Sequence, residues 1–289
     1  YDTFLKQYGL VVNFLTYSPV SLMSKTGLVE LAGNPAEEML GVETMGEVLT
    51  RQGVMSRSYL PIAISSSCLT RAQMRGSRVV PYRGFADLFA SVYETMSAEA
   101  GRRSLDFIYY NDIDTYNHLY GMTNERVRQG VDDFLTDLDR LIARLRAGKI
   151  GRTLVLLTAD HGHIPTTPDP SRDMKNQPDL IDTLTLRPTG ENRLTYFYPR
   201  AGKVETFLRE IAGKYPGEFS LVPSETFLAD GFFGPPPYHP DVRNRIGEYI
   251  AIAHGNSFLW WNPRPDRLHS RHGGLSAEEM IVPLIGCRV

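Results

Sequence analysis

Short apolar runs alternate along this chain with longer segments whose apolar residues recur at helical spacing. Residues 105–111 form an apolar run typical of a buried strand, and residues 153–159 form a second, strongly apolar run. Between them, residues 123–148 carry apolar side chains every three or four positions, with Thr123 as the expected N-cap and Gly148 at the end. This order predicts a βαβ unit whose two strands are parallel and joined by a right-handed crossover.

The rest of the chain continues the alternation with weaker patterns. Apolar runs predict strands at residues 10–17, 53–60, 195–199, 249–253 and 280–286. Helical spacing predicts helices at residues 82–99 and 204–214, and a proline-rich stretch predicts a loop at residues 234–240. The alternation indicates an α/β fold with a mostly parallel sheet and helices on both faces, formed as a single domain over residues 1–289.

Composition narrows the classes of protein. The formal net charge is -2 with no basic run, so binding to a nucleic-acid polymer through bulk charge is not expected. No apolar stretch reaches about 18 residues, so no membrane-spanning helix is predicted. Cys68 and Cys287 are too few for a disulfide framework, which favours a reducing, cytoplasmic compartment. Tyr1 opens the chain without a signal-peptide pattern, so we expect the start to be a cut.

Five residues of metal-ligand type stand in three short motifs beside the apolar runs. They are Asp114, His118, Asp160, His161 and His272. The first two pairs follow the ends of the two strands of the βαβ unit, and parallel strands end at the same edge of a sheet. Carboxylate and imidazole ligands mixed in this way suit zinc or manganese. Each motif also has a simpler interpretation: a chance loop pattern, an N-cap with an exposed histidine, and a turn.

Other polar residues near these motifs have plainer interpretations. His163 is expected in a solvated loop, although it stands close enough in sequence to reach a substrate. His239, His254 and His269 have no ligand partner at useful spacing and are expected to be structural. Glu278 and Glu279 follow Ser276 and are expected to cap or line the start of a helix.

Taken together, the motifs Asp-x-x-x-His, Asp-His-Gly and His-Gly-Gly-Leu-Ser-Ala-Glu-Glu-Met resemble those of the alkaline phosphatase superfamily. The closer likeness is to its type I phosphodiesterase and nucleotide pyrophosphatase branch. The resemblance implies an alkaline-phosphatase-like domain that binds two divalent metals, with zinc as the first choice and manganese as the alternative. It further implies that Asp114, His118 and His272 hold one metal, that Asp160 and His161 hold the other, and that a Ser or Thr attacks phosphorus.

The chain departs from that family pattern in two places. The family's sixth ligand is an Asp ending an early strand, and its nucleophile is a Ser or Thr at a later helix start. Asp2 and Thr3 have no strand before them, and residues 65–67 (Ser-Ser-Ser) follow an apolar run without a suitable Asp upstream. We therefore expect the N-terminal part of the domain, with both residues, to be absent from this chain.

The region between the second and third motifs, at about residues 164–268, combines loops with short mixed elements. It is either a cap inserted beside the site or ordinary extra sheet and connections. Its aromatic side chains could stack on a nucleotide base or simply pack together, and they are Tyr196, Phe232, Phe233 and Tyr238.

The leading functional hypothesis is a metal-dependent phosphoester hydrolase acting on a small phosphorylated substrate, with diesters or pyrophosphates favoured. One alternative is a truncated or degenerate member that binds metal or a phosphorylated ligand without turnover. A second alternative is a phosphomutase of the same superfamily.

Overall fold

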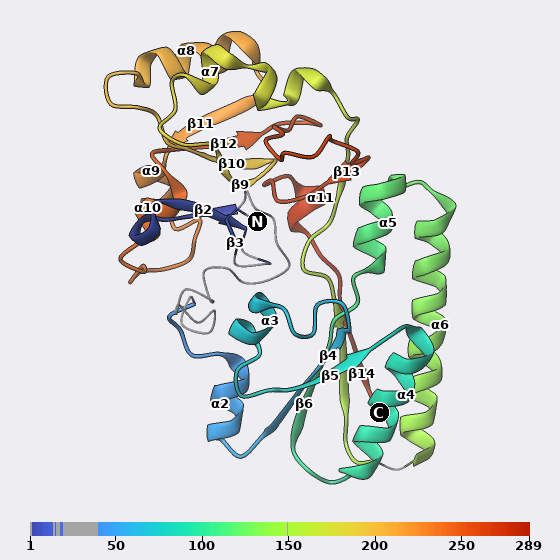
Figure 1. Ribbon diagram of the computed structural model, residues 1–289. Helices are drawn as coiled ribbons and strands as arrows, with labels where there is room; N and C mark the ends of the chain where they lie inside the picture. Colours follow the sequence, from blue (N-terminus) through green and yellow to red (C-terminus); the bar gives the residue numbers. More distant parts are fainter. Residues whose placement is uncertain (1, 14, 16–17, 20–39, 149) are drawn as a thin grey trace.

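The computed structural model describes residues 2–13, 15, 18–19, 40–148 and 150–289 (Figure 1). Two parts lie one above the other in this view. The lower part contains parallel strands flanked by helices, with α2 and α3 on one side and α4 and α6 on the other. The upper part is built around an antiparallel sheet. The bounds of the helices at the two sides of the parallel strands are α2 Met45–Arg51, α3 Cys68–Gln73, α4 Phe85–Ala98 and α6 Glu125–Gly148.

The parallel sheet of the lower part has the strand order β5-β4-β6. Its strands are β4 Met55–Pro61, β5 Arg78–Tyr82 and β6 Ser104–Ile108. Both neighbours pair with β4 in parallel, as expected for strands joined through helices. Helix α4 packs against α6 over one face and buries Leu88, Val92, Leu141 and Leu145. This apolar cluster holds the helices against the sheet.

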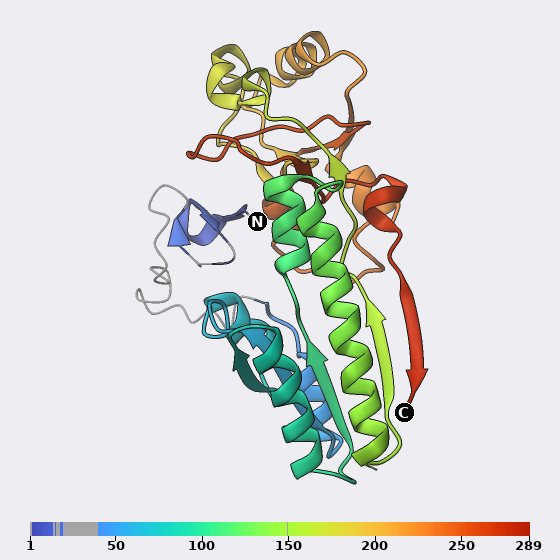
Figure 2. The ribbon, with the colours of Figure 1, turned by 90° about the vertical axis from the view of Figure 1, so that its right-hand side faces the viewer.

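A second pair of strands extends the lower part. β7 Leu154–Thr158 pairs antiparallel with β14 Leu284–Arg288. The two strands of the predicted βαβ unit do not pair with each other, because β6 pairs with β4 and β7 pairs with β14. The two strands nevertheless point the same way, so both end toward the upper part (Figure 2).

The strand predicted at residues 105–111 is present as β6, but the expectation that it is buried was wrong. Leu105 and Phe107 are exposed by 42% and 45%, and Leu154 and Leu156 on β7 by 60% each. Their neighbours in sequence are half-buried, so one face of each strand is more covered than the other. In the described part of the chain, one face of β6 and β7 therefore carries exposed apolar side chains.

The antiparallel sheet of the upper part has the strand order β11-β12-β10-β9-β1-β2-β3. Its strands are β1 Asp2–Leu5, β2 Leu10–Asn13, β3 Ser18–Pro19, β9 Thr189–Glu191, β10 Leu194–Phe197, β11 Phe219–Pro223 and β12 Tyr249–Ala253. Most of these strands belong to the stretch at about residues 164–268, but β1 and β2 come from the start of the chain. Its core contains Phe197, Phe207, Ile211 and Leu259.

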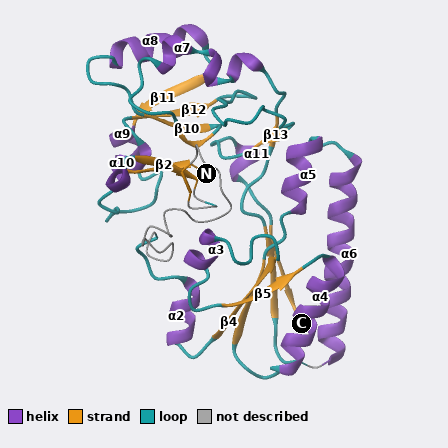
Figure 3. Cartoon of the chain, in the orientation of Figure 1, coloured by secondary structure: helices purple, strands orange, loops and turns teal. Residues whose placement is uncertain are grey.

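Four helices lie above and beside this sheet (Figure 3). They are α7 Pro178–Ile181, α8 Val204–Lys214, α9 Ser224–Ala229 and α10 Val242–Ile246. The predicted helix at residues 204–214 and the predicted strand at residues 249–253 coincide with α8 and β12. Part of the predicted strand at residues 10–17 lies outside the described residues. The prediction for residues 280–286 began too early, because a helical turn precedes β14 and Pro283 has no N–H for a ladder.

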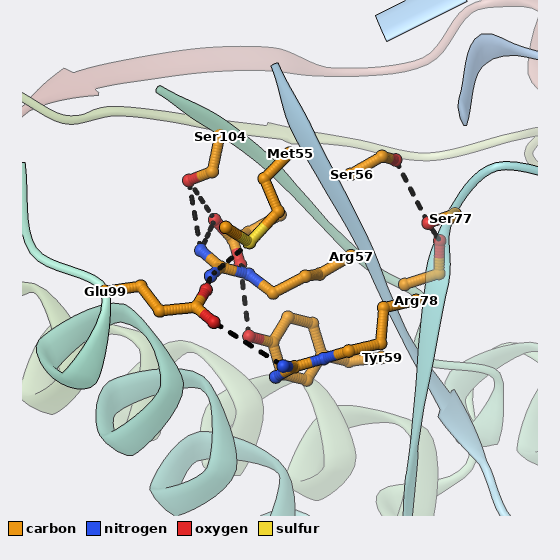
Figure 4. Close-up of polar contacts among 10 residues, drawn as sticks. Met55, Ser56, Arg57, Tyr59, Ser77, Arg78, Glu99 and Ser104 are labelled. Carbon is orange, nitrogen blue, oxygen red and sulfur yellow. Dashed lines mark hydrogen bonds and ion pairs between the residues drawn. The ribbon is translucent and has the colours of Figure 1, made fainter. Parts of the chain in front are cut away.

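A buried polar network ties β4 to its neighbours at the far end of the lower part (Figure 4). The Arg57 side chain is almost fully buried and donates to both carboxylate oxygens of Asp106, at 2.6 and 2.7 Å. It also forms an ion pair with Glu99 and donates to Ser104. Since a buried guanidinium needs partners for its N–H groups, this network is a structural feature of the sheet.

No helix in the described ranges is long and apolar enough to cross a membrane.

Candidate metal centre

The first motif lies on a helix rather than in a loop. Helix α5 spans Asp112–Tyr120 and begins shortly after β6 ends. Residues four apart on a helix share one face, so Asp114 and His118 project together. Their side chains approach to 3.3 Å between Oδ1 and Nε2. Gly121, which has a φ of 84°, ends the helix. The spacing of four residues was the signal for a helix that the sequence interpretation missed.

The second motif occupies the turn after β7. His161 carries its ring against that of His272, with centroids 3.5 Å apart and planes at 12°. Gly162 packs tightly behind it, because its N–H donates to the Glu279 carbonyl and an added Cβ would overlap the backbone oxygen of Glu278. Only glycine fits this close approach between two backbones.

The third motif follows a short strand pair. β13 Ser270–Arg271 pairs antiparallel with β8 Ile164–Pro165, so the residue before His272 is fixed next to the second motif. The loop then turns at Gly273, whose φ is 92°, and leads to α11 Ala277–Met280. This pairing explains how residues more than a hundred positions apart meet.

A buried ion pair holds the loop after His272. Glu279 accepts from the Arg193 guanidinium at 2.7 and 2.9 Å, and both side chains are fully buried. The same carboxylate accepts from the Gly274 N–H at 2.8 Å. Glu279 lines the first turn of α11 as expected, but its side chain turns inward to Arg193 and does not cap the helix. Arg193 lies just before β10, so the pair links the antiparallel sheet to the third motif.

Four histidines converge on one carboxylate oxygen. The distances from Asp114 Oδ1 to the Nε2 atoms are 2.9 Å for His163, 3.3 Å for His118, 3.8 Å for His272 and 4.0 Å for His161. Among the described residues, two groups bring their ligand atoms within 4.8 Å of one another: Asp114, His118 and His272, and Asp114, His161 and His163. Asp114 belongs to both groups and is the centre of the site.

His163 is buried at the centre of the site, whereas Asp160 lies at its exposed edge. His163 was expected in a solvated loop, but its side chain is only 7% exposed and contacts Asp114. Asp160 was expected as a ligand, but its side chain is 67% exposed and its nearest metal-ligand partner is His161, at 3.8 Å. It belongs to neither of the two groups. Its role as a ligand stays a prediction.

The charges around Asp114 favour its ionised form. Burial alone would raise the pKa of this carboxyl, but the bonds to His118 and His163 outweigh burial and lower it. The pKa of His118 is raised, because its pairing with Asp114 outweighs burial. The pKa of His272 is lowered to about 3, first by burial and then by the neighbouring His161. A neutral His272 beside an ionised Asp114 is the state that binds a metal cation.

Backbone carbonyls select the tautomers of two of the histidines. His118 Nδ1 lies 2.8 Å from the Ser270 carbonyl oxygen, and His161 Nδ1 lies 3.0 Å from that of Gly162. In the neutral ring that binds a metal, each Nδ1–H donates to its carbonyl, and the Nε2 lone pair is directed at the centre. Two imidazoles and a carboxylate in this arrangement fit the ligand chemistry of zinc, and manganese is also compatible.

Ser67 and Asp2, which were compared with the family's nucleophile and sixth ligand, have partners outside the candidate centre. Ser67 caps α3 by accepting from the Thr70 N–H at 3.1 Å. Asp2 pairs with Arg187 within the antiparallel part. Glu191 at the end of β9 stands near the site, because its side chain approaches Gly273. Burial raises the pKa of Glu191, and the smaller opposing effects include those of His161 and His118. The sequence interpretation did not single out Glu191.

The fold matches solved structures of one class of enzyme. Human ectonucleotide pyrophosphatase/phosphodiesterase 5 has a TM-score of 0.61 and 18% identity, over 84% of this chain and 62% of its own. The murine protein has a TM-score of 0.58 and 17% identity, over 83% of this chain and 62% of its own. An inactive murine variant in complex with AMP has a TM-score of 0.59 and 16% identity, over 99% of this chain and 70% of its own. The chain thus spans less than two thirds of the first two relatives.

The fold class expected from the sequence, an alkaline-phosphatase-like α/β domain, is confirmed by this likeness. A model of the type I phosphodiesterase / nucleotide pyrophosphatase family matches residues 49–275, so the chain belongs to this family. No curated protein matches the chain. The resemblance drawn from the three motifs is therefore confirmed at the level of the family.

Proposed function

We propose that this chain carries the metal centre of a phosphoester hydrolase that acts on phosphodiesters or nucleotide pyrophosphates. The observation that supports it most is the convergence of four Nε2 atoms on Asp114, in two groups of three that share this carboxylate. Family membership supports the same reaction class. Two divalent metals, zinc first and manganese as the alternative, would neutralise charge on the transferring phosphoryl group and lower the pKa of an attacking oxygen.

The candidate ligands of this chain would form two metal sites. Asp114, His118 and His272 would hold one metal, and His161 with Asp160 would hold the other, as the family pattern implies. Asp160 lies in the turn after β7, where its exposed carboxylate is accessible to a metal. The bonds from Nδ1 of His118 and His161 to carbonyl oxygens keep the Nε2 atoms directed inward. Preorganised ligands of this kind do not need to reorient during the reaction.

A nucleotide is the substrate class that we favour. The inactive murine relative was solved with AMP, which suggests a site of similar chemistry here. Aromatic rings of the antiparallel part offer stacking surfaces: Phe232 and Phe233 are partly exposed, and Tyr196 lies against Phe233 with centroids 6.3 Å apart. The bond of Tyr238 to the Leu228 carbonyl argues instead that this ring is structural.

A non-catalytic member that binds metal or a phosphorylated ligand is the second candidate. It is favoured because neither residue that the family pattern requires, an early Asp and a Ser or Thr nucleophile, was found in a matching place in the sequence. Residues 65–67 have no suitable Asp upstream, and Asp2 is paired with Arg187.

Hydrolysis of bis(p-nitrophenyl) phosphate by the zinc-loaded chain separates the two candidates. We expect turnover that exceeds that of p-nitrophenyl phosphate and that is lost on chelation. His254→Ala is the matched control, because His254 bonds to Ser220 in the antiparallel sheet and lies in neither ligand group. Zinc binding without any turnover would favour the non-catalytic candidate, and transfer of phosphate between substrates without release would favour a phosphomutase.

A further inference from the structure

His163 is a buried residue that the family pattern does not assign to the metal centre. It stands two positions after His161, in the segment between the turn and β8. Its ring lies edge-on to three other histidine rings, with centroids 4.9 Å from His118, 5.2 Å from His272 and 5.3 Å from His161. A side chain this deeply placed among candidate ligands has a defined orientation.

Both ring nitrogens of His163 have partners. Nε2 lies 2.9 Å from Asp114 Oδ1, and Nδ1 lies 3.0 Å from the Ser270 hydroxyl. A carboxylate accepts hydrogen bonds and does not donate them, so Nε2–H donates to Asp114. In the neutral ring the other nitrogen is an acceptor, so the Ser270 hydroxyl donates to Nδ1. The three side chains form a chain of donors that ends on the shared carboxylate.

Ser270 also connects these hydrogen bonds to the one that orients His118. The Ser270 side chain is fully buried, its hydroxyl orients His163, and its carbonyl oxygen accepts from His118 Nδ1. One residue of β13 therefore fixes two imidazoles, one of which donates to Asp114 while the other directs Nε2 to the centre. The strand pair β13–β8 holds Ser270 and the segment of His163 in register.

We propose that His163, held by Ser270, is a positioning residue that fixes the orientation of Asp114 for metal binding. Metal-binding carboxylates and imidazoles need outer partners that fix their orientation, and loss of such a partner weakens affinity or activity about 10- to 100-fold. The inference rests on the proposed metal-dependent function for its catalytic consequence, but metal affinity tests it independently of turnover. Direct ligation by His163 is the competing role.

Three variants separate these roles through metal affinity measured by chelator competition. His163→Ala removes the donor to Asp114, and we expect zinc affinity to fall about 10- to 100-fold. His163→Gln keeps an N–H donor at a similar reach and should restore affinity to within about threefold of the parent chain, since a single neutral hydrogen bond is preserved. Ser270→Ala leaves the imidazole but frees Nδ1, and we expect an intermediate loss.

The visible spectrum of the cobalt-loaded chain provides the second readout. A positioning role leaves the set of ligand atoms unchanged, so the band positions and intensity per bound cobalt should match the parent in every variant. His254→Ala is the matched control, because it removes another histidine whose ring bonds to a serine, Ser220, at 2.8 Å. Thermal unfolding of each variant without metal checks that the chain remains folded.

Three outcomes would overturn the inference. A changed cobalt spectrum in both His163→Ala and His163→Gln would make His163 a ligand. Unchanged zinc affinity in His163→Ala would remove it from the centre altogether. A His163→Gln variant as weak as His163→Ala would contradict a role exerted through the donor N–H. Absence of hydrolysis by the parent chain would count against the proposed function alone, because the metal measurements are made without substrate.

Discussion

The two halves of the candidate centre are held by different kinds of structure. The α5 half consists of Asp114, His118 and His272, and the turn half consists of Asp160 and His161. In the α5 half, two ligands stand four apart on a helix and the third follows a paired strand. In the turn half, both residues lie between β7 and β8 without a helix or strand of their own.

The difference appears in burial and in partners. The His272 side chain is 10% exposed and that of Asp160 is 67% exposed, whereas His118 and His161 are alike at 21% and 20%. The turn half is braced mainly from behind, where Gly162 packs on the backbone of α11. A rigid helix and a strand pair fix side chains more closely than a turn does, so the α5 half is preorganised and the turn half depends on its contacts.

Replacing Asp114 tests whether the halves are independent. Asp114 belongs to both ligand groups, so Asp114→Asn should abolish binding at both at once. We expect hydrolysis to fall about 1000-fold or more, since removal of a single preorganised charged group costs on the order of 100- to 1000-fold. Elemental analysis after desalting should find almost no zinc.

The control is Asp137→Asn on helix α6, where the carboxylate bonds only to the neighbouring Arg140 among the contacts described. It should retain the parent's zinc content and rate. If Asp114→Asn kept one equivalent of zinc, the two halves would be separable and Asp114 would not be shared.

Elements with long, regular periodicity were the best predicted from the sequence. Helix α8 and strand β12 coincide with their predictions, because each carries a full pattern and a clear end. Pairing between strands was not predictable in the same way. β6 and β7 were expected in one βαβ unit because a helix joins them, yet β7 pairs with β14, more than a hundred residues later in the sequence. Sequence order contains little information about such long-range pairing.

Within the site, motif residues were predictable but their partners were not. The spacing of Asp114 and His118 places both on one helix face, as periodicity allows. His163 looked like an ordinary loop residue, because its burial depends on Ser270, more than a hundred residues away. Glu279 looked like a helix cap, because nothing near it in sequence indicates Arg193. Residues that act through distant contacts need the fold before their role is visible.

Single replacements in each half sharpen the comparison. His272→Ala removes a buried ligand of the α5 half, and we expect activity to fall about 100- to 1000-fold with loss of one equivalent of zinc. Asp160→Asn changes an exposed carboxylate of the turn half, and we expect a smaller loss of about 10- to 100-fold, close to that for an outer partner. Rates at saturating zinc and zinc content measure both.

The order of these two effects is the informative result. A larger loss in Asp160→Asn than in His272→Ala would mean that the turn half closes on its metal and becomes as ordered as the α5 half. Equal and negligible losses would remove both residues from the centre.

The Arg193–Glu279 pair tests how strongly the loop after His272 depends on the antiparallel sheet. Glu279→Gln leaves Arg193 as a buried charge without its carboxylate, which should lower the free energy of unfolding by about 3 kcal/mol. Activity should fall only about tenfold, since Gln still accepts from Gly274 and acts on His272 at a distance. Glu225→Gln, in an exposed pair with Arg243, is the matched control and should leave the free energy of unfolding nearly unchanged.

The pH dependence of the stability of the metal-free chain tests whether the charge of Glu279 causes the loss of stability in Glu279→Gln. Burial would raise the pKa of Glu279, but Arg193 outweighs it and holds the pKa below its ordinary value of 4.5. A carboxyl with a lowered pKa in the folded state stabilises the fold above pH 4.5, and this contribution disappears as the pH falls further. Chemical unfolding measured at pH 5.5 and at pH 3.5 should therefore show that the free energy of unfolding falls less between these pH values in Glu279→Gln than in the parent. Equal drops would mean that the pair orders the loop without contributing charge stabilisation, and the α5 half would then owe its order to α5 and β13 alone.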